Sequence, residues 1–250
     1  MTNDDIIAKF QPKLIDLKYV NLLKKPLEST RLLIYGEIHG AKENADIVYT
    51  LVRRLGIRQL AVENNPNVNK FIRAASNGIY DFSLIDSDTF DTSILSLEIA
   101  KTIATLIGEG QIQRIHYIDT YFNDPHPLNL DHTDSPQDRE RALAKNIIAL
   151  DRSEYTLCIL GQWHTQPHSI ELSDGTIHKS ALYRIRQTIP RAPFVHIIYR
   201  GGNIYNDSQI LTLPDRRDVT NTYCIKQLSI YDFDLHVPRA HHCVNEKQLQ

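Results

Sequence analysis

Acidic and histidine residues with the chemistry of a hydrolytic site follow short apolar runs in this sequence. Glu37 and His39 stand two residues apart after the run RLLIY, and His164 follows the run YTLCIL. Imidazole titrates near neutral pH, and an adjacent carboxylate fixes its tautomer, so this pair can act as a general base or as a metal ligand. The simpler interpretation is that each histidine only hydrogen-bonds a loop.

Glu63 and Arg139 extend the set. Glu63 ends the apolar run IRQLAV, where an unpaired carboxylate would be costly. Arg139 lies in the first turn of a predicted helix, in phase with Leu143 and Asn146, so we expect it to point inward and Arg141 to be solvated. Glu63 and Arg139 could form a structural salt bridge, or the arginine could stabilise negative charge in a reaction.

The remaining candidates are weaker. Asp119 closes a third apolar run, and the period-2 alternation of a strand puts it on the opposite face from His116, so at most one of them faces a site. The position at the end of the run favours Asp119. Trp163, beside His164, is either a wall of a substrate pocket or a hydrophobic cap. Six histidines are expected to be exposed polar residues: His126, His132, His168, His178, His241 and His242.

The elements that must position these residues follow a repeating pattern. Each short apolar run ends in polar residues and is followed by an amphipathic segment, which is typical of βα units. Strands are predicted at 31–40, 57–66, 112–120, 155–165, 192–200 and 222–231, and helices at 45–55, 93–108, 136–150 and 179–188. Ligands of a parallel sheet bind beyond the carboxyl ends of its strands. The set Glu37, His39, Glu63, Arg139 and His164 is therefore predicted to converge at that edge.

The predicted fold is an α/β three-layer sandwich with a mainly parallel central sheet flanked by helices. Residues 1–30 are predicted to form a helical segment packed on the core, residues 31–235 the α/β domain, and residues 236–250 a loose tail. The stretch 121–133, rich in Pro, His, Asn and Asp, is predicted to be a long functional loop.

Composition excludes several classes of protein. A chain of 250 residues with 42% hydrophobic residues can bury one large core, and a net charge of −2 argues against nucleic-acid or membrane-surface binding. No export signal or membrane-spanning run is visible, so a cytoplasmic location is expected. The three cysteines are too widely spaced for a disulfide framework or a zinc ribbon, and Cys158 reads as a core residue. The motifs of serine hydrolases, P-loop NTPases, dinucleotide-binding proteins and zincins are missing.

Four segments resemble a known superfamily. GEIHGAKE at 36–43, VEN at 62–64, RERALAKNI at 139–147 and LGQWH at 160–164 are similar, in order and rough spacing, to motifs of the erythromycin esterase, ChaN, TraB/PrgY and Tiki superfamily. The resemblance implies an α/β core with a charged His/Glu/Arg pocket. Carried over by position, it matches Glu37, His39, Glu43, Glu63, Arg139 and His164 to the superfamily's motifs, with Glu43 as a further substrate-binding candidate. Leu143 stands where the superfamily usually has Met, and the export signal of ChaN and Tiki members is missing.

The leading hypothesis is a hydrolase of an ester, amide or phosphoester bond, acting on a small-molecule or peptide substrate. In a metal-assisted version, Glu37, His39 and His164 hold Mn²⁺ or Zn²⁺. Water is expected to be activated by His39 or His164; in a metal-free version, Glu37 or Glu63 orients His39 as general base and Arg139 stabilises the oxyanion. The alternatives are a ChaN-type protein that binds haem or another iron ligand through a histidine, and a non-catalytic member of the superfamily.

Overall fold

The computed structural model describes residues 9–63, 69–79, 96–119, 136–206 and 209–243. Its centre is a seven-stranded sheet in the order β10-β11-β7-β1-β4-β2-β3, in which only β10 runs antiparallel to its neighbour. The strands are β1 (Leu32–Glu37), β2 (Gln59–Val62), β3 (Arg114–Tyr117), β4 (Thr156–Gly161), β7 (Phe194–Tyr199), β10 (Cys224–Gln227) and β11 (Asp232–Val237). The predicted α/β sandwich with a mainly parallel sheet is confirmed.

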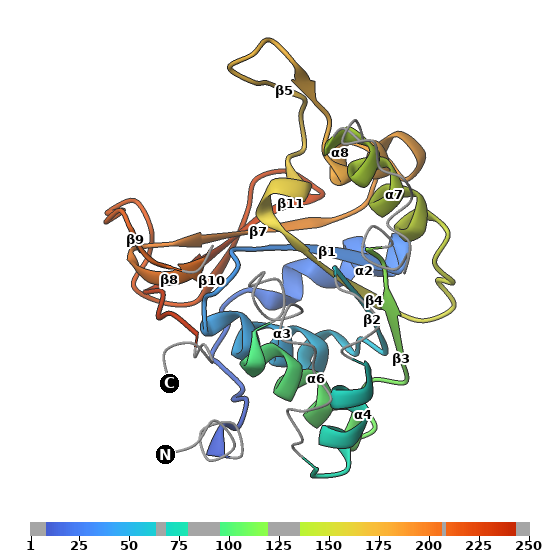
Figure 1. Ribbon diagram of the computed structural model, residues 1–250, viewed down its shortest axis with the longest axis vertical. Helices are drawn as coiled ribbons and strands as arrows, with labels where there is room; N and C mark the ends of the chain where they lie inside the picture. The colour runs from blue at the N-terminus through green and yellow to red at the C-terminus, as the bar shows by residue number, and fades with distance from the viewer. Residues whose placement is uncertain (1–8, 64–68, 80–95, 120–135, 207–208, 244–250) are drawn as a thin grey trace.

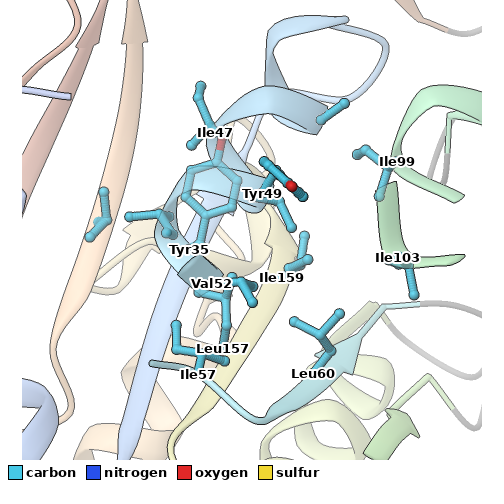
Figure 2. Packing of buried hydrophobic residues seen from close by; sticks show 14 of the residues in the cluster. Tyr35, Ile47, Tyr49, Val52, Ile57, Leu60, Ile99, Ile103, Leu157 and Ile159 are labelled. Atoms are coloured by element: carbon cyan, nitrogen blue, oxygen red, sulfur yellow. The ribbon is translucent and has the colours of Figure 1, made fainter. Parts of the chain in front are cut away.

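Helices cover both faces of this sheet (Figure 1). One face carries α3 (Glu43–Leu55), α4 (Asn69–Ser76) and α6 (Leu97–Gly108), and the other carries α7 (Pro136–Ile148) and α8 (Ala181–Thr188). The two apolar clusters reflect strand alternation, because Leu33 and Tyr35 face the α3 side while Leu32 and Ile34 face the α7 side. Figure 2 shows the larger cluster, in which Val52 of α3 and Ile103 of α6 pack near the side chains of the strands.

The predicted βα units match observed elements, and the ends of the elements differ by a few residues. Two hairpins were not predicted: β5 (Ile170–Glu171) with β6 (Ile177–His178), which projects from the body in Figure 1, and β8 (Gly202–Asn206) with β9 (Gln209–Leu213). Helix α4 was also missed. The predicted loop 121–133 lies outside the described residues.

The N-terminal segment packs on the core as predicted, and its helical residues among those described are Lys9 and residues 20–30. The 3₁₀ helix η1 (Val20–Leu23) and α2 (Lys24–Thr30) bury Leu23 and Leu27 in the α3-side cluster. Before them, Lys18 forms a parallel bridge with Cys224 of β10. In the described part of the chain, no helix combines the length and apolar composition needed to cross a membrane.

The predicted loose tail from residue 236 is wrong for residues 236–243. Residues His236 and Val237 belong to β11, which pairs in parallel with β7, and Ala240 and Cys243 are buried. The amide of Cys243 donates to the carbonyl of Gly40, 2.9 Å away. The polar letters of DFDLHV conceal this strand, because Phe233, Leu235 and Val237 face the core while Asp232 and Asp234, on the alternate face, are only partly buried.

Candidate active site

The turn after β1 places an acid and a histidine in contact. Glu37 is the last residue of β1, and its Oε1 lies 3.0 Å from Nδ1 of His39. The fully buried side chain of Asn44 holds this turn, since its Nδ2 donates to the carbonyl of Ile38 at 2.8 Å. The Asn44 Oδ1 in turn accepts a hydrogen bond from the hydroxyl of Tyr35 at 2.7 Å. The pair therefore rests on a buried network, although the extended conformation ends at Glu37.

The end of the neighbouring strand β4 contributes a glycine, Gly161, whose backbone lies against the site. Gly161 is the register partner of Glu37, and a Cβ atom built on it would lie 2.5 Å from Nε2 of His39 and 3.4 Å from Oε2 of Glu63. The backbone angles of Gly161 are φ −59° and ψ 145°, which any residue can adopt. Glycine is therefore needed here for space, because the imidazole and the carboxylate both approach the peptide.

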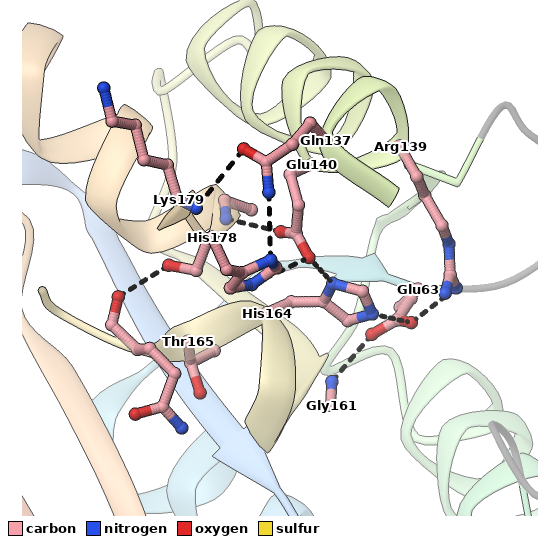
Figure 3. Close-up of polar contacts among 12 residues, drawn as sticks. Glu63, Gln137, Arg139, Glu140, Gly161, His164, Thr165, His178 and Lys179 are labelled. Carbon is pink, nitrogen blue, oxygen red and sulfur yellow. Dashed lines mark hydrogen bonds and ion pairs between the residues drawn. The ribbon is translucent and has the colours of Figure 1, made fainter. Parts of the chain in front are cut away.

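The carboxylate of Glu63 contacts Gly161, Arg139 and His164, as Figure 3 shows. Its Oε2 accepts from the amide of Gly161 at 2.7 Å, and its Oε1 lies 2.8 Å from Nη2 of Arg139 and 3.0 Å from Nε2 of His164. Arg139 also donates to Oδ2 of Asp119 from Nε and from Nη2, at 3.0 and 2.7 Å. As predicted, Arg139 pairs with the buried acids, and Arg141 is exposed.

His164 lies on the 3₁₀ helix η5 (Gln162–Thr165), between two carboxylates. Its Nδ1 contacts Oε1 of Glu140 at 2.7 Å, and Oε2 of Glu140 accepts from the amide of Ala181 at 2.6 Å. We did not predict a role for Glu140. The available signal was its helix phase, because Glu140 shares a buried face with Ala144 and Ile147.

The carboxylates around His164 determine its charge. Burial lowers the pKa of His164, but the hydrogen bonds and charges of Glu140 and Glu63 outweigh burial and raise this pKa to about 9. Burial raises the pKa of Glu63, but His164, His39 and Arg139 together lower it to about 2. At neutral pH His164 is therefore an imidazolium that donates from both nitrogens. An imidazolium has no lone pair to accept a proton from water, so the neutral form of His39 is the candidate general base.

The Glu37 and His39 pair is electrostatically different. Burial raises the pKa of Glu37, and the contact with His39 offsets this only in part. Burial lowers the pKa of His39, but the hydrogen bond and charge of Glu37 prevail, so that this pKa lies above its usual value. The other carboxylate oxygen of Glu37 is buried and has no hydrogen-bond partner among the described residues. The pair therefore shares a proton between Nδ1 of His39 and Oε1 of Glu37, while no positively charged group contacts Oε2 of Glu37 among the described residues.

The five residues Glu37, His39, Glu63, Arg139 and His164 converge at the carboxyl ends of β1, β2 and β4, with Asp119 beside them. Two other candidates lie elsewhere. Glu43 does not contact this set, because its carboxylate accepts from the amide of His241 at 2.9 Å and also contacts its Nδ1. The half-exposed ring of Trp163 lies 4.7 Å from the ring of His178.

The prediction of exposed histidines is wrong for His178. Its side chain is buried at the base of the β5–β6 hairpin, with Nε2 3.6 Å from Glu140 and Nδ1 3.0 Å from Nε2 of Gln137. His168 and His241 are exposed as expected and His242 is partly buried, whereas His126 and His132 lie outside the described residues.

The predicted metal set of Glu37, His39 and His164 does not fit this geometry. Both ring nitrogens of His164 already contact carboxylates, so neither has a lone pair to offer a metal. Within the described ranges, no group of three or more His, Cys, Asp or Glu side chains could hold a metal ion. The haem alternative stays an untested prediction.

No protein-family model matches the chain, and no curated protein matches it. Its fold is similar to RRSP, an effector domain of a MARTX toxin from Vibrio vulnificus, with 17% identity and a TM-score of 0.47 over 86% of this chain and 40% of that one. A Bacillus cereus protein matches with 14% identity and a TM-score of 0.48 over 89% of this chain and 82% of its own. The C-terminal region of Pasteurella multocida toxin matches with 13% identity and a TM-score of 0.43, over 90% of this chain and 29% of that one. The chain thus spans less than half the length of the two toxin structures, and none of these likenesses assigns it a function.

Proposed function

We propose that the chain is a hydrolase of the erythromycin esterase, ChaN, TraB/PrgY and Tiki superfamily in which His39 activates water without a metal. The observation that carries the proposal is the contact between Nδ1 of His39 and Oε1 of Glu37, 3.0 Å. In neutral His39 this contact fixes the proton on Nδ1, which leaves a lone pair on Nε2 to accept a proton from water. His39 then returns that proton to the leaving group after water oxygen has attacked the carbonyl carbon.

The charges around this base favour a neutral substrate. Four carboxylates, from Glu37, Glu63, Asp119 and Glu140, stand against the two cations Arg139 and His164 in the described part of the site. Such an excess of negative charge repels a phosphoester, which is itself an anion. Of the three bond types expected from the sequence, we therefore propose an ester or an amide. In this proposal Arg139 and His164 supply the positive charge that offsets the oxyanion.

The acids have separate roles in this proposal. Glu37 orients His39 and stabilises the imidazolium that forms on proton transfer. Glu63 positions His164 and Arg139, and Glu140 keeps His164 protonated, so that the positive charge is present before the reaction starts. The residues Glu63 and Glu140 are thus positioning residues, and His39 is the catalytic base.

The test is hydrolysis of a panel of neutral p-nitrophenyl esters and peptide p-nitroanilides, with p-nitrophenyl phosphate as the charged comparison. We expect turnover of a neutral substrate, no dependence on added Mn²⁺ or Zn²⁺, and no loss with a chelator. His39→Ala should reduce kcat by about 10²- to 10⁴-fold, as removal of a general base does. His116→Ala is the matched control, because His116 contacts Gln59 on the sheet rather than the site.

Two results would contradict the proposal. Unchanged turnover in His39→Ala would show that His39 is not the general base. Full dependence of turnover on a metal would refute the metal-free mechanism. Tight haem binding with an absorption band that disappears in His39→Ala, without hydrolysis of any substrate, would favour the ChaN-type alternative.

A further inference from the structure

A separate cavity lies on the α7 side of the sheet, where α8 no longer covers it. Its volume is about 270 Å³. Four side chains from the neighbouring parallel strands β7 and β11 form its floor. Phe194 and His196 of β7 stand opposite Asp232 and Asp234 of β11 in the register of the sheet. None of Glu37, His39, Glu63, Arg139 and His164 lines this cavity.

The roof of the cavity is held in place by hydrogen bonds. It consists of Thr165, the last residue of η5, and of residues 166–168, which follow this helix. The Thr165 hydroxyl donates to the carbonyl of Gln162 at 2.9 Å, and the Ser180 hydroxyl donates to the carbonyl of Gln166 at 2.6 Å. A Cβ atom on Gly36 would lie 2.5 Å from Oγ1 of Thr165, so the roof packs directly on β1. The cavity is therefore preformed, as sites for small ligands usually are.

The polar groups of the cavity favour a cation. Arg186 is already used, because its Nη2 lies 2.7 Å from Asp232 and also donates to the carbonyls of Ala192 and Tyr231. The carboxylate of Asp234 has a weaker partner, Nδ1 of His196 at 3.6 Å, which is longer than a hydrogen bond. Asp234 thus offers acceptor capacity to a ligand.

Lys226 is the obvious competitor for this carboxylate, since it is the register partner of Asp234 on β10. Its side chain is exposed, and the described contacts include no ion pair between the two residues. Lys226 does not line the cavity, whereas a ligand whose alkyl chain packs on the apolar walls can bring its ammonium group to Asp234 from inside the cavity.

The apolar walls suit a short alkyl chain. Phe194 forms part of the floor, Pro167 part of the roof, and Leu228 lies at the mouth with 64% of its surface exposed. Small-molecule pockets usually measure about 300–1000 Å³, so this cavity can take one side chain or a fragment of similar size. A cavity with the Asp234 carboxylate at one side, apolar walls, and its arginine already paired with Asp232 matches an alkylammonium ion.

We propose that this cavity is a binding site for a primary alkylammonium group of the size of a lysine side chain, with its charge on Asp234 and its methylene chain between Phe194, Pro167 and Leu228. The proposal does not depend on the hydrolase function, because the cavity and the residues of the proposed active site are separate.

The test uses two matched probes, the N-acetyl methylamides of lysine and of norleucine, which differ by the terminal ammonium. Titration of the ¹⁵N-labelled full chain should give NMR shift changes at residues 165–168 and 194–196 with the lysine probe, and much weaker binding of the norleucine probe. Asp234→Asn should reduce the affinity for the lysine probe by about tenfold, the usual effect of losing one charge-assisted hydrogen bond. Asp16→Asn, an exposed acid remote from the cavity, is the matched control.

A second pair of variants protects the test against misfolding of Asp234→Asn. Leu228 is exposed, so Leu228→Lys and Leu228→Ala should both fold. Leu228→Lys should weaken binding of the lysine probe more than Leu228→Ala does, because it adds a positive charge at the mouth of the cavity. The proposal is overturned if neither probe binds, if both bind equally, or if an anion such as glutarate binds at these residues in place of the lysine probe.

Discussion

The peptide of Gly161 lies directly against the imidazole of His39, so that a Cβ atom at position 161 would be 2.5 Å from Nε2. The same atom would be 3.4 Å from Oε2 of Glu63, a carboxylate that cannot retreat without losing its contacts with Arg139 and His164. Even a methyl group at this place therefore clashes with His39, while it reaches Glu63 only at van der Waals distance.

From this contact we predict that Gly161→Ala reduces turnover by about 10²-fold or more, since a shift of about 1 Å in a reacting group can cost that much. The measurement is kcat on the best substrate of the panel. Gly201→Ala is the matched control, because a Cβ there would meet its nearest neighbour, Asp215, at an ordinary 3.5 Å. Equal activity of the two variants would show that His39 does not need its observed position.

Arg139 and Arg141 offer a direct comparison within one helix. Arg139→Ala leaves the carboxylates of Glu63 and Asp119 buried without their guanidinium, which should lower the free energy of unfolding by about 3 kcal/mol. Arg141→Ala removes only an exposed pair with Asp138, and should change this free energy by less than about 1 kcal/mol. Urea unfolding of both variants measures the difference, and similar losses would contradict the burial argument.

The pKa of His164 predicts a loss of stability at alkaline pH. A histidine whose folded-state pKa is raised from 6.5 to about 9 adds stability that is complete below pH 6.5 and is lost as the pH rises through about 9. We therefore expect the free energy of unfolding to decline across that window. His164→Gln should remove this part of the decline. Urea unfolding from about pH 6 to about pH 9.5, which extends about half a unit beyond the two pKa values, measures it. A parallel decline in both proteins would rule out His164 as its source.

Glu140 should act on the reaction through His164. Glu140→Gln keeps a side-chain oxygen for the amide of Ala181 but removes the charge beside Nδ1 of His164. We predict that the pKa of His164 falls in this variant and that kcat falls while KM changes little, because less of the imidazolium charge is present at neutral pH. NMR titration of His164 gives the pKa, and Glu154→Gln, an exposed acid, is the control. An unchanged pKa of His164 would refute the positioning role.

The sequence by itself determined the layers of the fold and one edge of the site. Apolar runs such as RLLIY and YTLCIL can be stable only as buried parallel strands, and their polar ends must then meet at one edge of the sheet. Helix phase was enough to turn Arg139 inward and Arg141 outward. These inferences succeed because period and order along the chain are local properties.

The tertiary structure decided which groups share protons and which residues lie outside the site. Glu43 is spaced from His39 as the resemblance expects, yet the C-terminal segment returns to it and His241 takes its carboxylate. The sequence favours an exposed loop position for His178. In the structure this histidine is buried beside Glu140, which lies 38 residues earlier in the chain. The charge of His164 depends on Glu63 and Glu140, which come from two different elements. Such long-range electrostatic contacts have no period in the sequence, because they arise only when the strands and helices pack together.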